Sequence, residues 1–355
     1  MIGNLKVGAI FNGDYIALLS EINTKCKLNK ISEVYGSIQL HEKYTARPGY
    51  RIPIISMEYL ETYVAKLKEL NIDFVYTLNT SNLGGKKELL TQTPELKKVI
   101  KDLLNIGIKK YIVTLPYVAN IIRSVSEDAS IYISTIAHID TLTQIEVWND
   151  LYRIEGVCVN LLKNRDIHFL KAASSFCSSK GIKLELIANE FCCNGDARKE
   201  KMYTTHCIFR DHCYQIHSIG YTQEEDNILK YPMSCCKASR SKKVSWLKAN
   251  VIRPEDLYRY KEIGINSFKI TGRTATFTYI KKVLLSYANE SFEGNFLDLW
   301  FGFDNIRSEE ECKTSYIDNK DLNVFLDYWF NGDVRCADEV CGQTCQYCDN
   351  FLDSL

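Results

Sequence analysis

The sequence predicts an α/β fold: a (β/α)8 TIM-like barrel with a cysteine-rich insertion after strand 7 and a small C-terminal cysteine-rich extension. Three observations lead to this prediction. Short apolar segments of strand length alternate with amphipathic segments of helix length over residues 5–287. The alternation breaks at Asn189 and resumes at Ile252. Most of the 14 cysteines lie in that break or near the C-terminus. A doubly wound open sheet gives a similar alternation and is the main competing fold.

The predicted elements follow one another in a regular order. Eight strands are expected at 5–11, 33–38, 73–78, 110–115, 131–135, 156–161, 183–188 and 267–270. Helices are expected between them at 15–26, 57–70, 93–106, 141–151 and 165–180. After the insertion a helix should begin at Pro254, which suits a first helical position, and end at Gly264. Another helix should end at Tyr287.

These elements divide the chain into a barrel at 1–290, including the insertion at 189–248, and an extension at 291–355. In the extension, one group of apolar residues repeats at the spacing of a helix face. Its members are Leu322, Phe325, Leu326 and Trp329. We therefore expect a helix there that packs on the barrel.

Composition excludes several classes of protein. The 355 residues include 44 basic and 44 acidic side chains, and 46% are hydrophobic, which is typical of a globular protein rather than a disordered, collagen-like or coiled-coil chain. No window of 18 uninterrupted apolar residues occurs, so no membrane span is expected. The chain starts directly in a strand-like run without a basic segment before it, which predicts no secretory signal and a cytoplasmic location.

The C-terminal cysteines are closely spaced and predict a metal site. They are Cys336, Cys341, Cys345 and Cys348, with the spacing C-x4-C-x3-C-x2-C. In a reducing compartment disulfides are rare, so grouped thiols indicate metal ligands. The absence of a long gap between two close pairs is typical of iron–sulfur runs, and a structural zinc site is the alternative.

The central cysteines are spread more widely, so the fold must bring them together. They are Cys192, Cys193, Cys207, Cys213, Cys235 and Cys236. Because adjacent cysteines rarely bind one metal together, we expect one ligand from each pair, plus Cys207 and Cys213. Three of the chain's six histidines, His206, His212 and His217, lie in the same stretch and are candidate ligands, proton carriers or substrate contacts.

Polar residues at the ends of the predicted strands are candidates for an active site, because the C-terminal face of a barrel carries its function. Lys269 and Arg273 can clamp a carboxylate or phosphate, or else pair with acids on the helices. Glu190 can act as an acid or base, or orient a ligand cysteine, or form an ordinary salt bridge. Lesser candidates for substrate contacts are Asn79, Tyr35 and Ser134.

Several of these segments together resemble the collagenase-like peptidase family of unknown catalytic type. The segments are Asn189-Glu190-Phe191-Cys192, Cys207-Ile208-Phe209-Arg210, Cys235-Cys236, IRPEDL at 252–257 and FKITGR at 268–273. The run Cys345-Gln346-Tyr347-Cys348 fits a branch with an extra C-terminal cysteine group. Two departures are Cys213, where a histidine is expected, and Thr271, where the family often has an acid.

The resemblance implies an oxygen-independent hydroxylase that binds a 4Fe–4S cluster, modifies RNA or a ubiquinone precursor and uses prephenate as oxygen donor. The implied cluster ligands are Cys192, Cys207, Cys213 and Cys236. We therefore expect an iron–sulfur redox enzyme with two clusters, the second alternatively zinc, and an electron donor such as ferredoxin or flavodoxin. The substrate is an RNA, a small aromatic molecule or a peptide, and the zero net charge does not favour RNA.

Two other functions remain as alternatives. The chain can be a non-catalytic, metal- or cluster-bearing scaffold for a partner enzyme. It can also be a true peptidase, although the sequence contains neither an H-E-x-x-H zinc motif nor a G-x-S-x-G nucleophile elbow.

Overall fold

The computed structural model describes residues 2–47, 49–190, 243–300, 315–332, 334–339 and 343–355. Its centre is a closed barrel of eight parallel strands, β1 to β8, that pair in chain order. The strands are β1 Gly3–Gly8, β2 Asn29–Gly36, β3 Asp73–Leu78, β4 Lys110–Val113, β5 Ser130–Ile133, β6 Gly156–Cys158, β7 Lys183–Ile187 and β8 Ser267–Ile270. Because β1 pairs with both β2 and β8, the predicted barrel is confirmed and the open sheet is wrong.

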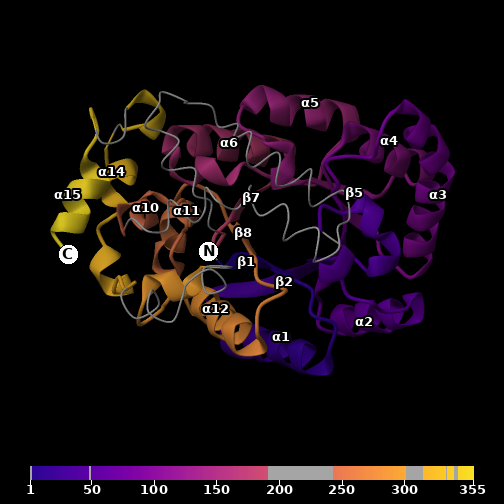
Figure 1. Cartoon of the computed structure of the whole chain (residues 1–355), viewed down its shortest axis with the longest axis horizontal. Coiled ribbons are helices and arrows are strands. Elements are labelled where there is room, and N and C mark those ends of the chain that lie inside the picture. The colour runs from indigo at the N-terminus through magenta and orange to yellow at the C-terminus, as the bar shows by residue number, and fades with distance from the viewer. Residues whose placement is uncertain (1, 48, 191–242, 301–314, 333, 340–342) are drawn as a thin grey trace.

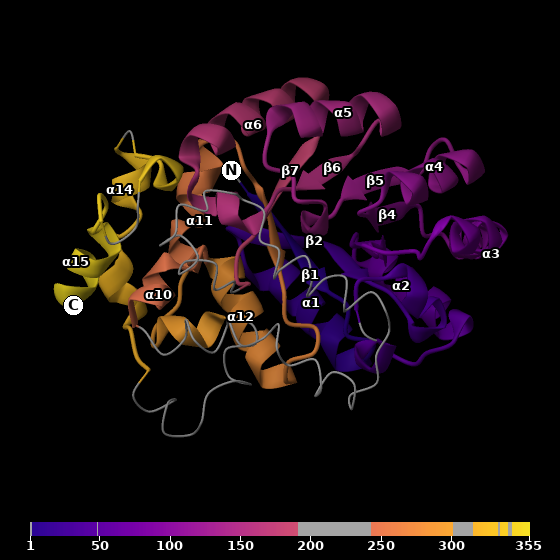
Figure 2. The same ribbon diagram turned by 45° about the horizontal axis from the view of Figure 1, so that its top comes forward.

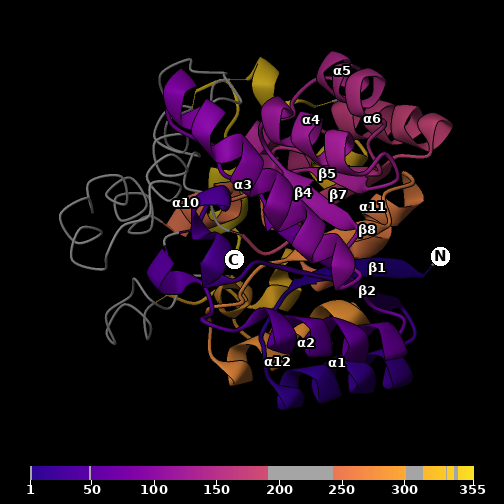
Figure 3. The same ribbon diagram turned by 90° about the vertical axis from the view of Figure 1, so that its right-hand side faces the viewer.

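Helices surround this barrel (Figure 1). They are α1 Gly13–Lys25, α2 Met57–Glu69, α3 Lys86–Asn105, α4 Pro116–Val125, α5 Leu142–Tyr152, α6 Ile167–Lys180, α10 Lys243–Lys248, α11 Leu257–Glu262, α12 Phe277–Asn289, α14 Asp327–Phe330 and α15 Tyr347–Asp353. Figure 3 shows α1, α2 and α12 along one side of the barrel, with α4, α5 and α6 along the opposite side.

Three elements differ from the prediction. Pro116, directly after the strand expected at 110–115, is the first residue of α4, a helix that was not expected from the sequence. Helix α3 begins at Lys86 rather than at residue 93 and contains Pro94. The expected continuous helix at 322–329 is wrong, because a 3-10 turn, Asn319–Leu322, is followed by turns and then by the short helix α14. Its four apolar side chains are nevertheless buried, as expected.

The floor of the barrel, toward the N-terminal ends of the strands, is filled by a charged network rather than by an apolar layer. Lys6 of β1, only 1% exposed, contacts Glu185 of β7 and lies 2.9 Å from Oε2 of Glu33 on β2. The Tyr132 hydroxyl donates to Oε1 of Glu33 at 2.8 Å. Lys110, the first residue of β4, lies 3.3 Å from the same oxygen. These residues, Lys6, Glu33, Glu185 and Tyr132, are called the floor network below.

The extension shares the hydrophobic core of the barrel. Figures 1 and 2 both show α14 and α15 beside α10 and α11. Lys248 at the end of α10 lies 3.1 Å from Asp349 of α15, and the Arg165 guanidinium stacks 4.9 Å from the ring centroid of Trp329. The extension is therefore held by both ionic and aromatic contacts.

The IRPEDL segment is the joint between the barrel and the extension. Arg253 binds the carboxylate of Asp256 through Nε at 2.7 Å and donates through Nη1 to the backbone oxygen of Asn319 at 2.5 Å. Glu255 accepts a hydrogen bond from the backbone N–H of Phe292. The most recognisable motif of the sequence therefore has a structural role in this fold.

Candidate active site at the barrel mouth

Lys269 is buried inside the mouth of the barrel, near the end of β8. Only 6% of the residue is exposed, and its Nζ lies 4.1 Å from the ring centroid of Tyr35 at the end of β2. Within the described residues Lys269 has no ion pair or hydrogen bond through its side chain, so it does not pair with a helix acid there. Burial lowers the pKa of its ammonium group, and the charge of Lys6 acts in the same direction, against Cys158, Glu185 and Glu190.

Arg273 lies across the ends of the first two strands, and two glycines make room for it. A Cβ added at Gly8 would lie 2.8 Å from Cβ of Arg273, and one added at Gly36 would lie 3.8 Å from its Nη1. Its Nε and Nη1 are buried and have no hydrogen-bond partner in the described part of the chain. Burial lowers the pKa of Arg273 well below its usual value, and the positive charge of Arg47 lowers it further.

Arg47 is a third cation at this place, and the sequence analysis missed it. It follows the 3-10 turn Gln39–Tyr44, in the connection between β2 and α2, and is half-buried. Burial lowers its pKa, while Tyr35 and Glu190 oppose the shift. No periodic pattern in the sequence marks Arg47, and only its place after a barrel strand could have indicated it. Lys269, Arg273 and Arg47 are called the cation cluster below.

Tyr35 contacts Lys269 through its ring, and its hydroxyl is also affected by the charges of Arg47 and Arg273. Burial raises the pKa of its hydroxyl to about 12, and the charges of Arg47 and Arg273 oppose that shift. The Tyr35 hydroxyl donates weakly to the backbone oxygen of Ile270 at 3.4 Å. Glu190, half-buried at the end of the described β7 region, is the acid whose charge acts on Tyr35, Arg47 and Lys269. The mouth therefore combines three cations, one neutral phenol and one carboxyl group.

The opposite side of the mouth is polar but uncharged, and its groups bind one another. Asn79 accepts from the backbone N–H of Ala46 at 3.3 Å and donates to Oγ of Ser134 at 3.5 Å. The Thr114 hydroxyl donates to the backbone oxygen of Asn79 at 2.9 Å. Asn79 and Ser134, which we expected to contact substrate, thus have partners within the protein.

Two strand-end residues have purely structural roles. Asn189 accepts from the backbone N–H of Thr271 at 2.7 Å and donates back to its carbonyl at 3.0 Å, so it ties the end of β7 to the end of β8. Asn12 caps α1 by accepting from the N–H of Tyr15 at 2.8 Å. Strand-end position alone therefore does not distinguish a site residue from a cap.

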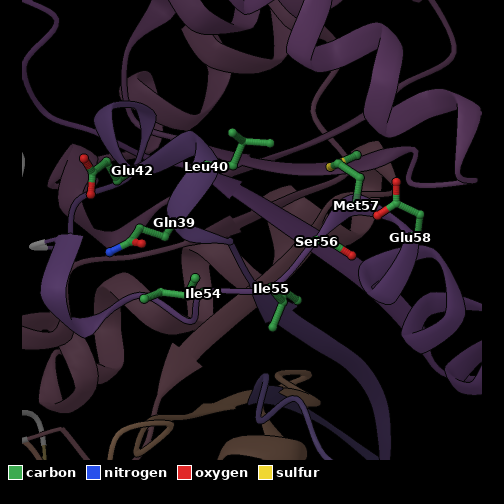
Figure 4. A pocket seen from close by; sticks show the side chains of 8 residues that line it. All are labelled: Gln39, Leu40, Glu42, Ile54, Ile55, Ser56, Met57 and Glu58. Atoms are coloured by element: carbon green, nitrogen blue, oxygen red, sulfur yellow. The ribbon is translucent and has the colours of Figure 1, made fainter.

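A separate open groove lies on the β2–α2 connection. It has a volume of about 720 Å³ and is lined by Gln39, Leu40, Glu42, Ile54, Ile55, Ser56, Met57 and Glu58 (Figure 4). Leu40 and Ile54 are 69% and 81% exposed. None of the cation cluster lines this groove, so the two features are distinct.

The predicted metal ligands fall largely outside the described residues. The implied cluster ligands Cys192, Cys207, Cys213 and Cys236 all lie there, as does Cys341. Cys336, Cys345 and Cys348 are described, and Trp329 Nε1 donates to the sulfur of Cys336 at 3.1 Å. Within the described ranges no three His, Cys, Asp or Glu side chains form a group that can hold a metal ion.

The fold and the mouth define a class of protein: a (β/α)8 barrel with three basic side chains near the C-terminal ends of its strands. The model of peptidase family U32 matches residues 33–291, and the chain belongs to this family. No helix within the described ranges has the length and apolar character needed to cross a bilayer.

Several known proteins are similar to this chain in sequence or in structure. An uncharacterized protease, MJ1657, from Methanocaldococcus jannaschii is 25% identical over 348 residues, which cover 96% of each chain. The solved structure of the U32 peptidase Mk0906 has a TM-score of 0.51 at 13% identity, covering 77% of this chain and 93% of that one. A D-psicose 3-epimerase from Clostridium cellulolyticum H10 has a TM-score of 0.40 at 10% identity, covering 92% and 99%.

Proposed function

We propose that the chain is an iron–sulfur-dependent enzyme that carries out redox modification of an anionic substrate, in the oxygen-independent hydroxylation that the resemblance implies. The observation that carries this proposal is the cation cluster. Three positive side chains gather at the mouth, and none has an acidic partner within 4 Å among the described residues. An anionic ligand would supply the missing charge.

The place of the central cysteines in the sequence supports a cofactor near the mouth. Their segment follows directly on Glu190 in the chain, and the charge of Glu190 acts on Arg47 and Lys269. Thiolates are soft ligands that suit iron–sulfur clusters, so the donor set fits the group. We propose Cys192, Cys207, Cys213 and Cys236 as ligands of a 4Fe–4S cluster, which when bound would supply single electrons.

The residues of the mouth would bind and orient the substrate. Arg273 and Arg47 suit a carboxylate or phosphate because a guanidinium donates two parallel hydrogen bonds. Lys269 adds positive charge, and the ring of Tyr35 provides a wall that excludes water. Glu190 would hold or accept a proton at its carboxylate. A carboxylate such as prephenate as oxygen donor and a ferredoxin or flavodoxin as electron donor belong to this proposal.

The C-terminal cysteines would hold a second cluster or a zinc ion through Cys336, Cys341, Cys345 and Cys348. Trp329 Nε1 donates to the sulfur of Cys336, and the Tyr328 hydroxyl lies 3.6 Å from the sulfur of Cys345. Donors to sulfur stabilise thiolate and tune a bound metal, which supports this site.

Anaerobic purification with iron and sulfide analysis tests the cofactor. We expect both elements, and their absence from oxygen-protected protein would overturn the proposal. Arg273→Met and Glu190→Gln then test the mouth, by product analysis of RNA and small molecules from cells. We expect lost modification with unchanged iron content, while Glu146→Gln on the exposed face of α5 keeps it. If modification survives both changes, the scaffold function is favoured.

The family and relative names favour peptidase activity as a second candidate. Burial raises the pKa of the Cys158 and Cys177 thiols to about 12, whereas a nucleophilic cysteine needs a lowered pKa. These two cysteines therefore do not suit that role. Peptide cleavage by metal-free protein would establish the peptidase function, and its absence would exclude a metal-independent one.

A further inference from the structure

Two lysines are buried inside the barrel, and they differ in their ion-pair partners. Lys6 is held between Glu33 and Glu185. Lys269 of β8 is the register partner of Lys6 on β1 and has no ion pair within the described residues. Burying an ammonium group without a carboxylate is costly, so such a lysine gives up its proton more readily than an exposed lysine does. A neutral lysine amine is a nucleophile, and buried lysines of this kind form imines with carbonyl compounds.

We propose that the Lys269 amine forms an imine with the carbonyl carbon of a 2-oxo acid whose carboxylate is bound by Arg273 and Arg47. This inference deepens the proposed function by naming the ligand class of the same mouth. It rests on that proposal for the anion-binding role of the arginines and does not depend on a metal or cluster.

The arrangement of the mouth carries the inference. The Lys269 Nζ faces the ring of Tyr35 at 4.1 Å, and Tyr35 is also the residue on which the charges of Arg47 and Arg273 act. The amine therefore lies against the ring of Tyr35, and the charges of both guanidiniums act on the hydroxyl of the same residue. A 2-oxo acid presents its carbonyl carbon directly beside its carboxylate, so one small molecule can engage both kinds of group.

Electrostatics supports a reactive amine. Burial lowers the pKa of Lys269, and the Lys6 charge adds to this effect. An ion pair with a carboxylate would raise the pKa of Lys269 again. Neither Glu185 nor Glu190 lies within 4 Å of its Nζ. The matched lysine, Lys6, has its pKa raised by those same kinds of groups, Glu185 and Glu33, despite burial. Lys6 should therefore stay charged and unreactive.

The reaction balances without an oxidant. The Nζ lone pair attacks the carbonyl carbon, and one of the two amine protons moves to the carbonyl oxygen to give a carbinolamine. The hydroxyl then leaves as water with the second amine proton, and a C=N bond replaces the C=O bond. Added borohydride delivers hydride to the imine carbon, and the nitrogen takes a proton, which leaves a stable secondary amine. With pyruvate the product is an Nζ-(1-carboxyethyl) group.

The experiment is reductive trapping of the full chain, purified anaerobically, with pyruvate and borohydride, followed by peptide mass mapping. We expect the carboxyethyl group on Lys269, and not on Lys6 or on the exposed Lys25. Labelling of Lys269 no greater than that of Lys25 would overturn the proposal. Because the wild-type protein is labelled, the result does not depend on whether a variant folds.

Acetone serves as the control probe, because it has the carbonyl group but no carboxylate. Charge-assisted hydrogen bonds to a carboxylate should make pyruvate trap at Lys269 roughly tenfold more readily than acetone. Arg273→Met should remove most of this preference, with folding checked by circular dichroism. Equal trapping of the two probes by the wild-type protein would refute the role of the arginines. Iron content and modification activity are measured separately, so failure of trapping is distinguishable from failure of the proposed function.

Discussion

The floor and the mouth of the barrel both contain buried charges, but only in the floor network are these charges paired with groups of opposite charge. In the floor network Lys6 contacts two carboxylates, and Glu33 also accepts a hydrogen bond from Tyr132. In the cation cluster, three positive groups have no such partners in the described part of the chain. The floor network lies on β1, β2, β5 and β7, whereas Lys269 lies on β8, Arg273 follows β8 and Arg47 lies in the connection between β2 and α2.

This comparison separates structure from function. A buried ion pair is expensive to desolvate, and its partners are then required for folding. Unpaired charges at the mouth of a barrel lower the stability of the fold. They are retained where a bound ligand supplies the opposite charge. We therefore expect substitutions in the floor to change stability, and substitutions in the mouth to change binding.

The largest effect is expected for Lys6→Met. It leaves Glu33 and Glu185 buried without their common cation, which should lower the free energy of unfolding by about 3–5 kcal/mol. Urea denaturation measures this change. Lys25→Met removes only the exposed pair with Glu21, so it should cost less than about 1 kcal/mol. Equal losses in the two variants would contradict a structural role for the floor.

Acid unfolding probes the floor network from the carboxylate side. Burial alone would raise the pKa of Glu33, but lysine charges led by Lys6 lower it from 4.5 to about 2. Since the folded pKa is the lower one, Glu33 contributes about 3 kcal/mol above pH 4.5 that is lost as the pH falls toward 2. Denaturation at several pH values should show this loss in the wild type and a flatter profile in Glu33→Gln. The same dependence of the unfolding free energy on pH in both proteins would refute this contribution of Glu33.

Lys269→Met should have the opposite character to Lys6→Met. Replacing an unpaired buried cation by an apolar side chain should leave the free energy of unfolding within about 1 kcal/mol of the wild type or raise it. Because the folded pKa of Lys269 lies below 10.5, wild-type stability should rise with pH toward that value, and this rise should be absent in the variant. Calorimetry should show at least roughly tenfold weaker pyruvate binding. A loss of unfolding free energy as large as that of Lys6→Met would show that Lys269, like Lys6, is required for folding.

Gly8→Ala should give the smallest effect and sharpen the comparison at the mouth. The added Cβ would lie 2.8 Å from Cβ and 3.6 Å from Cα of Arg273, so the backbone of Arg273 must shift and move its guanidinium. Loss of one well-aligned hydrogen bond should weaken pyruvate binding about fivefold. Gly13→Ala is the matched control, because nothing lies within 4 Å of the added atom. Equal binding by the two variants would exclude Arg273 as a ligand-binding group.

Much of the fold could be predicted from the sequence, because apolar runs alternate with amphipathic ones. All eight strands were found, although β1 begins at Gly3 rather than at residue 5. Helix α4 was missed because Pro116 ends one element and starts the next, and proline is compatible with both roles. The expected C-terminal helix was wrong because a spacing that buries four side chains is also satisfied by successive turns.

The site was only partly predictable. Lys269 and Arg273 were identified because they follow a strand, and the structure leaves both without ion pairs among its described residues. Arg47 and the floor network were not identified, because pairing between charges on β1, β2 and β7 depends on barrel closure and register. Neither is visible in a linear pattern of residues.

The contacts of Lys6 and Arg253 show that the segment matched by the family model is smaller than the segment that folds. The family match runs from residue 33 to residue 291. Glu33 and Glu185 inside it depend on Lys6, which precedes it, and Arg253 inside it donates to Asn319, which follows it. A protein trimmed to the matched residues would lose one barrel strand and both of these partners. Expression for biochemistry therefore needs the entire chain.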